Sequence, residues 1–265
     1  MSGRVLTRLF FGVVAVFLAA PIVVIAGVSI NAKRTLAFPP QGLSLDWYAQ
    51  MFTDEAWRSA ILRSVTIAAL SAVIAVLIAL PIAYTLWRRT TWVGRVVQLL
   101  GVSPFVLPPV ITALGALSLW ATVGFYGASW TVVISHAVFF TSLPLVTISL
   151  GFSSIDPAFP DAARTMGASE AVIARTIVAP LVLPYVISGL AFAFVLSLNE
   201  YIVAYMTVGF TVETVPIKIF NALRYGYTPT MASISVLFVA VAVLVFGLVA
   251  RFGDLPRLLG AWRRD

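Results

Sequence analysis

Long apolar runs separated by short polar segments set the pattern of this chain. Residues 9–30, 96–155 and 176–199 contain no Asp, Glu, Lys or Arg. A helix rises about 1.5 Å per residue, so runs of this length can cross the roughly 30 Å apolar core of a bilayer. The pattern therefore predicts an all-α integral membrane protein. The six expected membrane-spanning helices cover about 9–30, 64–87, 96–120, 131–151, 181–208 and 231–250.

The third expected span is rich in residues that break helices. It carries Gly101, Pro104, Pro108 and Pro109. Inside a membrane such residues are tolerated only where neighbouring protein or water satisfies the carbonyl groups that they release. We therefore expect this span to face a partner or a pathway.

A polar stretch at 31–63 separates the first two expected spans. Within it Leu45, Tyr48, Ala49 and Phe52 recur at the spacing of one helix face. We expect a short amphipathic helix at the outer interface of the membrane, where Trp and Tyr are favoured.

Composition supports one membrane domain over 1–265. The chain is 61% hydrophobic and 10% charged, whereas soluble domains carry about 25% charged residues. It contains no cysteine, which excludes disulfides and thiolate metal sites. The first run lacks an A-x-A cleavage site, so we expect a retained span and not a signal peptide.

The net charge of +7 bears on orientation. The basic residues form short clusters between apolar runs, the arrangement of a membrane protein oriented by cytoplasmic Lys and Arg, and not of a nucleic-acid binder. The predicted inner loops are consistently basic, so we expect a multi-pass protein with both termini in the cytoplasm.

A charged island interrupts the apolar sequence at 152–180. Asp161, Arg164, Glu170 and Arg175 lie within DAARTMGASEAVIARTIVAP. The pattern is helical on both sides of Gly167, a residue suited to a turn between helices. We expect one helix to start just after Pro160, and a helix–turn–helix to present one face to another molecule.

The spacing of this island resembles the E-A-A loop of permease subunits of binding-protein-dependent ABC importers. Asp replaces the first Glu of the motif, and Ala179 replaces its Leu. The resemblance implies a type I (MetI-like) permease architecture with a cytoplasmic coupling helix that docks on an ATPase. The residues assigned to this coupling are Asp161, Ala162, Ala163, Gly167, Ile177 and Pro180.

The resemblance also implies the partners. They are two ATPase subunits that bind ATP and Mg, a second and normally distinct permease subunit, and a periplasmic solute-binding protein at a bacterial inner membrane. This chain would be a non-catalytic subunit without a cofactor of its own. It has no G-x-x-x-x-G-K-[ST] motif, so ATP hydrolysis by that route is excluded.

The stretch LSLNEYIVAYMTVG is similar to the polyamine-type members of this group. Asn199 and Glu200 occupy a position that is often a pair of acids there. A carboxylate in the outer half of the membrane would line the pathway and favour a cationic solute; alternatively, Glu200 reaches water at the interface. His136 is expected to bond a neighbouring helix.

The expected function is therefore passage of a polyamine or a related cationic compound. An opine, a phosphonate or another small solute is the alternative. An ion-driven secondary transporter is less favoured, because we find no internal repeat and intramembrane charge is nearly limited to Glu200. A membrane enzyme would need convergent catalytic side chains that this sequence does not offer.

Overall fold

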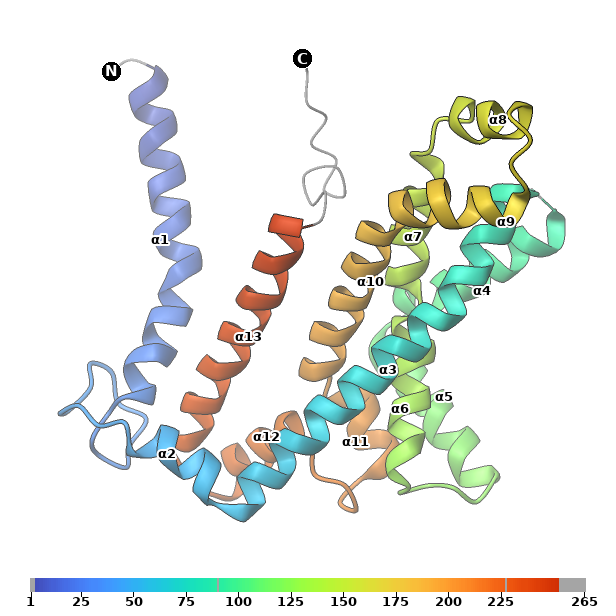
Figure 1. Cartoon of the computed structure of the whole chain (residues 1–265). Coiled ribbons are helices and arrows are strands. Elements are labelled where there is room, and N and C mark those ends of the chain that lie inside the picture. The colour runs from blue at the N-terminus through green and yellow to red at the C-terminus, as the bar shows by residue number, and fades with distance from the viewer. Residues whose placement is uncertain (1–2, 90, 227, 253–265) are drawn as a thin grey trace. The chain divides into compact units, whose positions relative to one another are not determined.

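The computed structural model describes residues 3–89, 91–226 and 228–252 (Figure 1). In that part of the chain the regular structure is helical, apart from an isolated bridge between Asn31 and Leu43. The chain divides into two compact units. One comprises Met1–Ile61 and Lys218–Ala242, and the other Leu62–Ile217 and Val243–Asp265.

The first unit contains α1 (Gly3–Ser29) and α2 (Asp46–Thr53), with the start of α3 (Glu55–Arg88) and parts of α12 (Val215–Tyr225) and α13 (Thr230–Phe252). Side-chain hydrogen bonds join these elements. Ser233 Oγ donates to the Ser29 carbonyl at 3.1 Å, and Thr230 Oγ1 donates to Gln50 Oε1 at 2.7 Å. The C-terminal end of α1 is thereby attached to α13.

Helix α2 forms close to the predicted position, and its apolar side chains differ in exposure. Leu45 and Phe52 are exposed, whereas Met51 is buried. Trp47 Nε1 donates to the Asn31 carbonyl at 2.7 Å, and the Tyr48 hydroxyl lies 2.8 Å from Ser29 Oγ. Both aromatic side chains are half-buried, and their polar atoms have the partners that such side chains usually find.

The second unit holds the remainder of α3 and most of the shorter helices. In chain order they are α4 (Trp92–Val106), α5 (Pro109–Thr122), α6 (Ser129–Phe140), α7 (Ser142–Ser153), α8 (Ala158–Thr165), α9 (Glu170–Ile173), the π-helix η1 (Ala174–Val178), α10 (Ala179–Asn199) and α11 (Ile202–Val208).

Among the residues that the structure describes, four helices are long and apolar enough to cross a membrane: Gly3–Ser29, Glu55–Arg88, Glu170–Asn199 and Thr230–Arg251. Two further pairs pass together but are bent, α4 with α5 by 109° and α6 with α7 by 42°. Counting each bent pair as one span gives up to six, the number predicted.

The third span is not the single helix predicted for 96–120. Its two helices meet at Leu107 and Pro108, which are both extended, with ψ angles of 146° and 133°. Proline lacks an N–H group and disfavours the helical conformation in the residue before it. The Pro108-Pro109 pair therefore ends α4 and starts α5 in a new direction.

A stripe of small residues lets α3 approach its neighbours closely. Ala68, Ala72, Ala75, Ala79 and Ala83 recur at three- and four-residue spacing, and each is at most 1% exposed. Close contact through small side chains is a main source of helix association where lipid removes the hydrophobic driving force.

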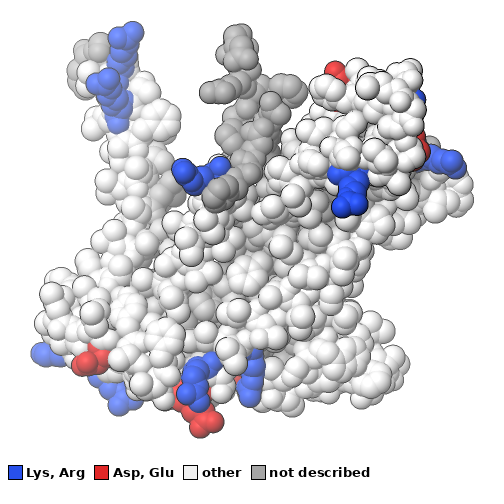
Figure 2. Space-filling view, in the orientation of Figure 1, with Lys and Arg blue, Asp and Glu red and all other residues white. Residues whose placement is uncertain are grey.

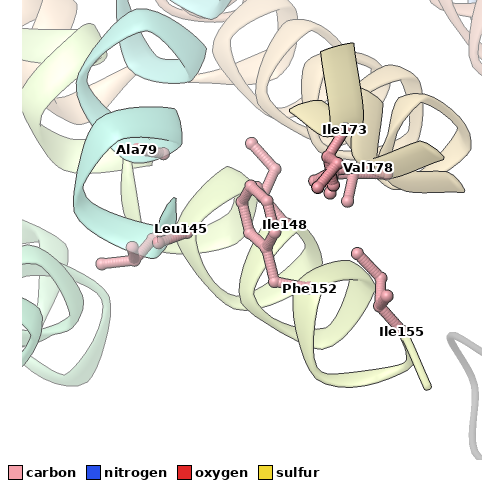
Figure 3. Packing of buried hydrophobic residues seen from close by; sticks show 9 residues of the cluster. Ala79, Leu145, Ile148, Phe152, Ile155, Ile173 and Val178 are labelled. Carbon is pink, nitrogen blue, oxygen red and sulfur yellow. The ribbon is translucent and has the colours of Figure 1, made fainter. Parts of the chain in front are cut away.

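The core beneath the charged island is shown in Figure 3. Ile148 and Phe152 of α7 lie between Ala79 of α3 on one side and Ile173 and Val178 on the other, and Leu145 lies on the side of Ala79. All of these residues are less than 9% exposed. The island is thus joined to membrane helices through a packed apolar cluster.

Charge is distributed as the sequence pattern predicts. The visible face around α8 and α9 carries both acidic and basic side chains (Figure 2). Along α1, beyond its first turns, the visible surface is uncharged (Figure 2).

Candidate functional site

The charged island folds into two short helices joined by a tight turn. Gly167 has a φ angle of +84°, in the region that glycine tolerates best. Its N–H donates to the Arg164 carbonyl at 2.9 Å, and the Ala168 N–H donates to the Ala163 carbonyl at 3.0 Å. This pair of bonds is a Schellman motif, which ends α8 and sets the direction of α9.

Helix α8 starts earlier than predicted. It begins at Ala158, whose N–H donates to Asp156 Oδ1 at 2.9 Å. Pro160 is buried inside the first turn and does not precede it. Proline is tolerated there because the first N–H groups of a helix have no intrahelical acceptor. Asp161 still lies in the first turn, as predicted.

A chain of ion pairs ties the island together and fastens it to α3. Arg164 Nη1 donates to Asp161 Oδ1 at 2.6 Å, and Arg164 Nε donates to Glu170 Oε1 at 2.6 Å. Arg88, at the end of α3, donates through Nη2 to Glu170 Oε2 at 2.8 Å. The hydrogen bond with Glu170 is the main reason that the pKa of Arg164 is raised.

The island continues directly into a membrane helix. The segment α9–η1–α10 runs without interruption from Glu170 to Asn199. Its π-helical turn is closed by a bond from the Ala179 N–H to the Ala174 carbonyl. Such single wide turns are frequent at functional sites. Here the wide turn directly precedes Pro180, in the first turn of α10.

The coupling residues predicted from the motif occupy two environments. Ala163 and Ile177 pack against the core cluster and are half-buried. Asp161, Ala162, Gly167 and Pro180 are exposed.

Sequence reasoning missed two residues of the exposed surface. Phe159 is 58% exposed, and Met166 is 86% exposed. With Ala162 they follow the i, i+3, i+7 spacing of one helix face. That spacing was visible in the sequence.

Asn199 and Glu200 lie at the other end of α10, as its last residue and its C-cap. The prediction of one helix over 181–208 is wrong there, because Glu200 is extended with ψ of 130° and α11 starts only at Ile202. The Glu200 carboxylate accepts from the N–H groups of Val203 at 2.8 Å and Ala204 at 3.0 Å. It thus satisfies N–H groups that lack partners at the start of α11.

His136 links this break to α6. Its Nε2 lies 3.0 Å from Glu200 Oε2, and its Nδ1 lies 2.8 Å from Ser197 Oγ. The exposed fractions of the two side chains are 1% for His136 and 9% for Glu200. The prediction that His136 bonds a neighbouring helix is confirmed.

Asn199 has a different environment. It is exposed, and its Nδ2 donates to the Val195 carbonyl at 2.8 Å. Within the described residues no cluster of three His, Cys, Asp or Glu side chains could hold a metal ion. The polar chemistry described here therefore consists of a charged surface at one end of α10 and a hydrogen-bonded break at the other.

Comparison with known proteins identifies the family. Residues 73–254 match the family described as "Binding-protein-dependent transport system inner membrane component". The spermidine/putrescine transport system permease protein PotC of Haemophilus influenzae is 29% identical over 92% of this chain and 94% of its own. The putrescine transport system permease protein PotI of Escherichia coli is 30% identical over 88% of this chain and 85% of its own.

A solved bacterial ABC transporter that imports the acidic polysaccharide alginate has the same fold. It superimposes with a TM-score of 0.68 at 18% identity, over 94% of this chain and 95% of that one. The chain therefore belongs to the family of binding-protein-dependent transport system inner membrane components, as a multi-pass, non-catalytic permease subunit of an ABC importer.

Proposed function

We propose that this subunit forms half of the pathway for a polyamine or a related cationic solute, and that α8 docks on an ATPase subunit and transmits its motion. The observation that carries the coupling role is the continuous connection from the exposed island to a membrane helix. Glu170–Asn199 is one helix through η1, and Glu170 is also bonded to Arg88 of α3.

The exposed apolar face of α8 is the proposed contact with the ATPase. Phe159 and Met166 offer apolar side chains, and Ala162 between them leaves room for close approach. Asp161 is already bonded to Arg164, yet its side chain remains 66% exposed. It retains acceptor capacity for a basic residue of the partner.

Several contacts join the island to α10, which supports the proposed transmission of motion from α8. The Schellman turn and the Arg164 ion pairs hold α8 against α9, and Ile173 and Val178 anchor the base in the core cluster. Motion of rigid elements about an interface is a common basis of switching.

The assembly that we propose follows the family. ATP and Mg bind to two partner ATPase subunits, a second and distinct permease subunit completes the pathway, and a periplasmic binding protein delivers the solute. The charged island and both termini lie in the cytoplasm. The basic ends of α1 and α3 support this orientation.

Site-directed cross-linking tests the coupling role cleanly, because the chain has no cysteine. Met166→Cys, in the intact transporter, is expected to cross-link to the ATPase subunit. Phe210→Cys is the matched control, since it is 77% exposed and directly follows α11 at the far end of α10. Cross-linking through Phe210→Cys alone, or labelling of Met166→Cys from the periplasm, would refute the proposal.

Support for a polyamine comes from the two curated relatives, which are named for spermidine and putrescine transport. One observation favours the alternative of another small solute. The Glu200 carboxylate is occupied by His136 and by two backbone N–H groups, so the exposed polar group at this end of α10 is the uncharged Asn199.

Uptake kinetics test whether a cationic solute contacts Asn199. If a dication passes Asn199, Asn199→Asp should lower the half-saturation constant for putrescine, and Asn199→Leu should raise it. Glu200→Gln should weaken the contact between Glu200 and His136, and it should therefore lower the unfolding temperature of the protein. Equal half-saturation constants for the wild type and both Asn199 variants would show that Asn199 does not contact the solute.

A further inference from the structure

An apolar groove runs beside the base of the charged island in the second unit. It has a volume of about 470 Å³, and its walls come from α3, α7, η1 and α10. It is lined by Leu80 and Tyr84 of α3, Leu183 and Val186 of α10, and Phe152 of α7, among others. Leu183 is 54% exposed, so the groove is open to its surroundings at this residue.

A cationic pocket adjoins the groove at the end of α3. It has a volume of about 360 Å³ and is lined by Tyr84, Thr85, Arg88, Arg89 and Thr91. Tyr84 belongs to both cavities.

The two cavities share one face of α3. Leu80, Tyr84 and Arg88 follow one another at four-residue intervals, which places them in a row on a helix. From Leu80 to Arg88, the last residue of α3, this row extends about 12 Å along the helix axis. An apolar groove therefore passes directly into a site with two guanidinium groups.

Arg89 is the cation best placed to receive an external anion. Arg88 is bonded to Glu170, whereas Arg89 has no acidic partner among the residues that the structure describes. Guanidinium groups bind phosphate oxygens in a bidentate manner and are weakly hydrated.

We propose that this composite cavity binds an anionic phospholipid, with the phosphate at Arg88 and Arg89 and one acyl chain in the groove between α3 and α10. The cationic pocket matches the negative charge of the headgroup, and the apolar groove matches the acyl chain. Basic pockets between membrane helices recognise anionic headgroups by the same chemistry. The proposal needs neither the solute nor the ATPase contact to be as proposed above.

The site has a consequence for coupling. The groove is bordered by Ala174 and Val178 of η1, and its cationic end contains Arg88, the residue that fastens Glu170 to α3. A bound lipid would therefore touch both the wide helical turn and the ion pair that connect the island to the membrane helices. Anionic lipid is expected to stiffen this connection.

Photolabelling tests the assignment. The intact transporter, with the full-length chain and its partner subunits, is reconstituted in vesicles of phosphatidylcholine that contain phosphatidylglycerol with a photoreactive acyl chain. Labelled positions are mapped by mass spectrometry. We expect labels on 80–84 and 179–186, and about fivefold less labelling in Arg89→Gln, the factor expected for one basic side chain at an anionic surface.

Two matched controls accompany these variants. Arg95→Gln removes another exposed basic residue that does not line the pocket, and it should label like wild type. Leu183→Trp fills the groove and should abolish labelling, whereas Leu181→Trp, which is 44% exposed and outside the groove, should not.

Three results would overturn the proposal. Equal labelling by a phosphatidylcholine probe would show that the anionic headgroup is not recognised. Displacement of the lipid by inorganic phosphate would assign the pocket to a free anion. Protection of the groove by a helix of a second subunit, seen as protein–protein cross-linking in place of lipid labelling, would give the surface another occupant.

Discussion

The contact between α7 and α10 offers a sharp test of the packing that supports the island. Gly189 lies in α10, and a Cβ atom placed there would lie 2.8 Å from Pro144 Cα and 2.6 Å from Thr147 Oγ1. Carbon atoms make their best contact at 3.5–4.0 Å, so the approach to Pro144 is about 0.7 Å too short. Because Pro144 Cα belongs to the backbone, relief requires the two helices to separate.

Gly189→Ala should therefore destabilise the protein by about 1–3 kcal/mol through overpacking. The same change gains up to about 1 kcal/mol in helix propensity, and Gly115→Ala in α5 provides a control for that gain. A Cβ atom at Gly115 meets nothing within 4 Å. The propensity terms cancel between the two variants, which leaves the packing cost.

Thermal unfolding in detergent, followed by near-ultraviolet circular dichroism, measures the difference. We expect Gly189→Ala to unfold roughly 2–12 °C below Gly115→Ala, given about 2–4 °C per kcal/mol for chains of this size. Unfolding of the two variants at one temperature would show that α7 and α10 do not pack as closely as described.

Two further predictions concern the island itself. Gly167→Ala forces a left-handed conformation on a residue with a Cβ atom, at a cost of about 1–2 kcal/mol, although the site has open space. Uptake by this variant should fall. Gly167→Asn should retain more uptake, because Asn tolerates this conformation better. Equal uptake by the two variants would show that the conformation of the turn at Gly167 does not affect transport. Arg88→Gln and Glu170→Gln should each reduce uptake, and the double variant should be no worse than either single one. Their unfolding temperatures should change little, because the pair is exposed; additive losses of uptake would contradict a shared role.

Local chemistry made part of this structure predictable. Gly167 marks a turn because glycine readily adopts a positive φ angle, and the apolar runs mark the spans because lipid demands them. The prolines at 108 and 109 disfavour a continuous helix, but the direction of the helix that follows them depends on the neighbouring helices. The 109° bend therefore could not be predicted from local sequence.

Other features depend on contacts distant in sequence. Arg88 and Glu170 pair across 82 positions, and no periodicity connects them. The break at Glu200 has no proline near it. It depends on the backbone N–H groups of α11 and on His136. His136 lies 64 positions from Glu200, so no local sequence pattern connects the two residues.

Helix α10 unites these features because it is attached at both ends. At one end the island is bonded to α3 through Glu170, and at the other Glu200 and Ser197 are bonded to His136 of α6. Between them α10 packs along α7, with Gly189 at the tightest approach. A load on α8 should therefore displace α3, α7 and α10 together as one body. If it does, we expect a pathway to open where this body meets other elements, and not by bending of α10.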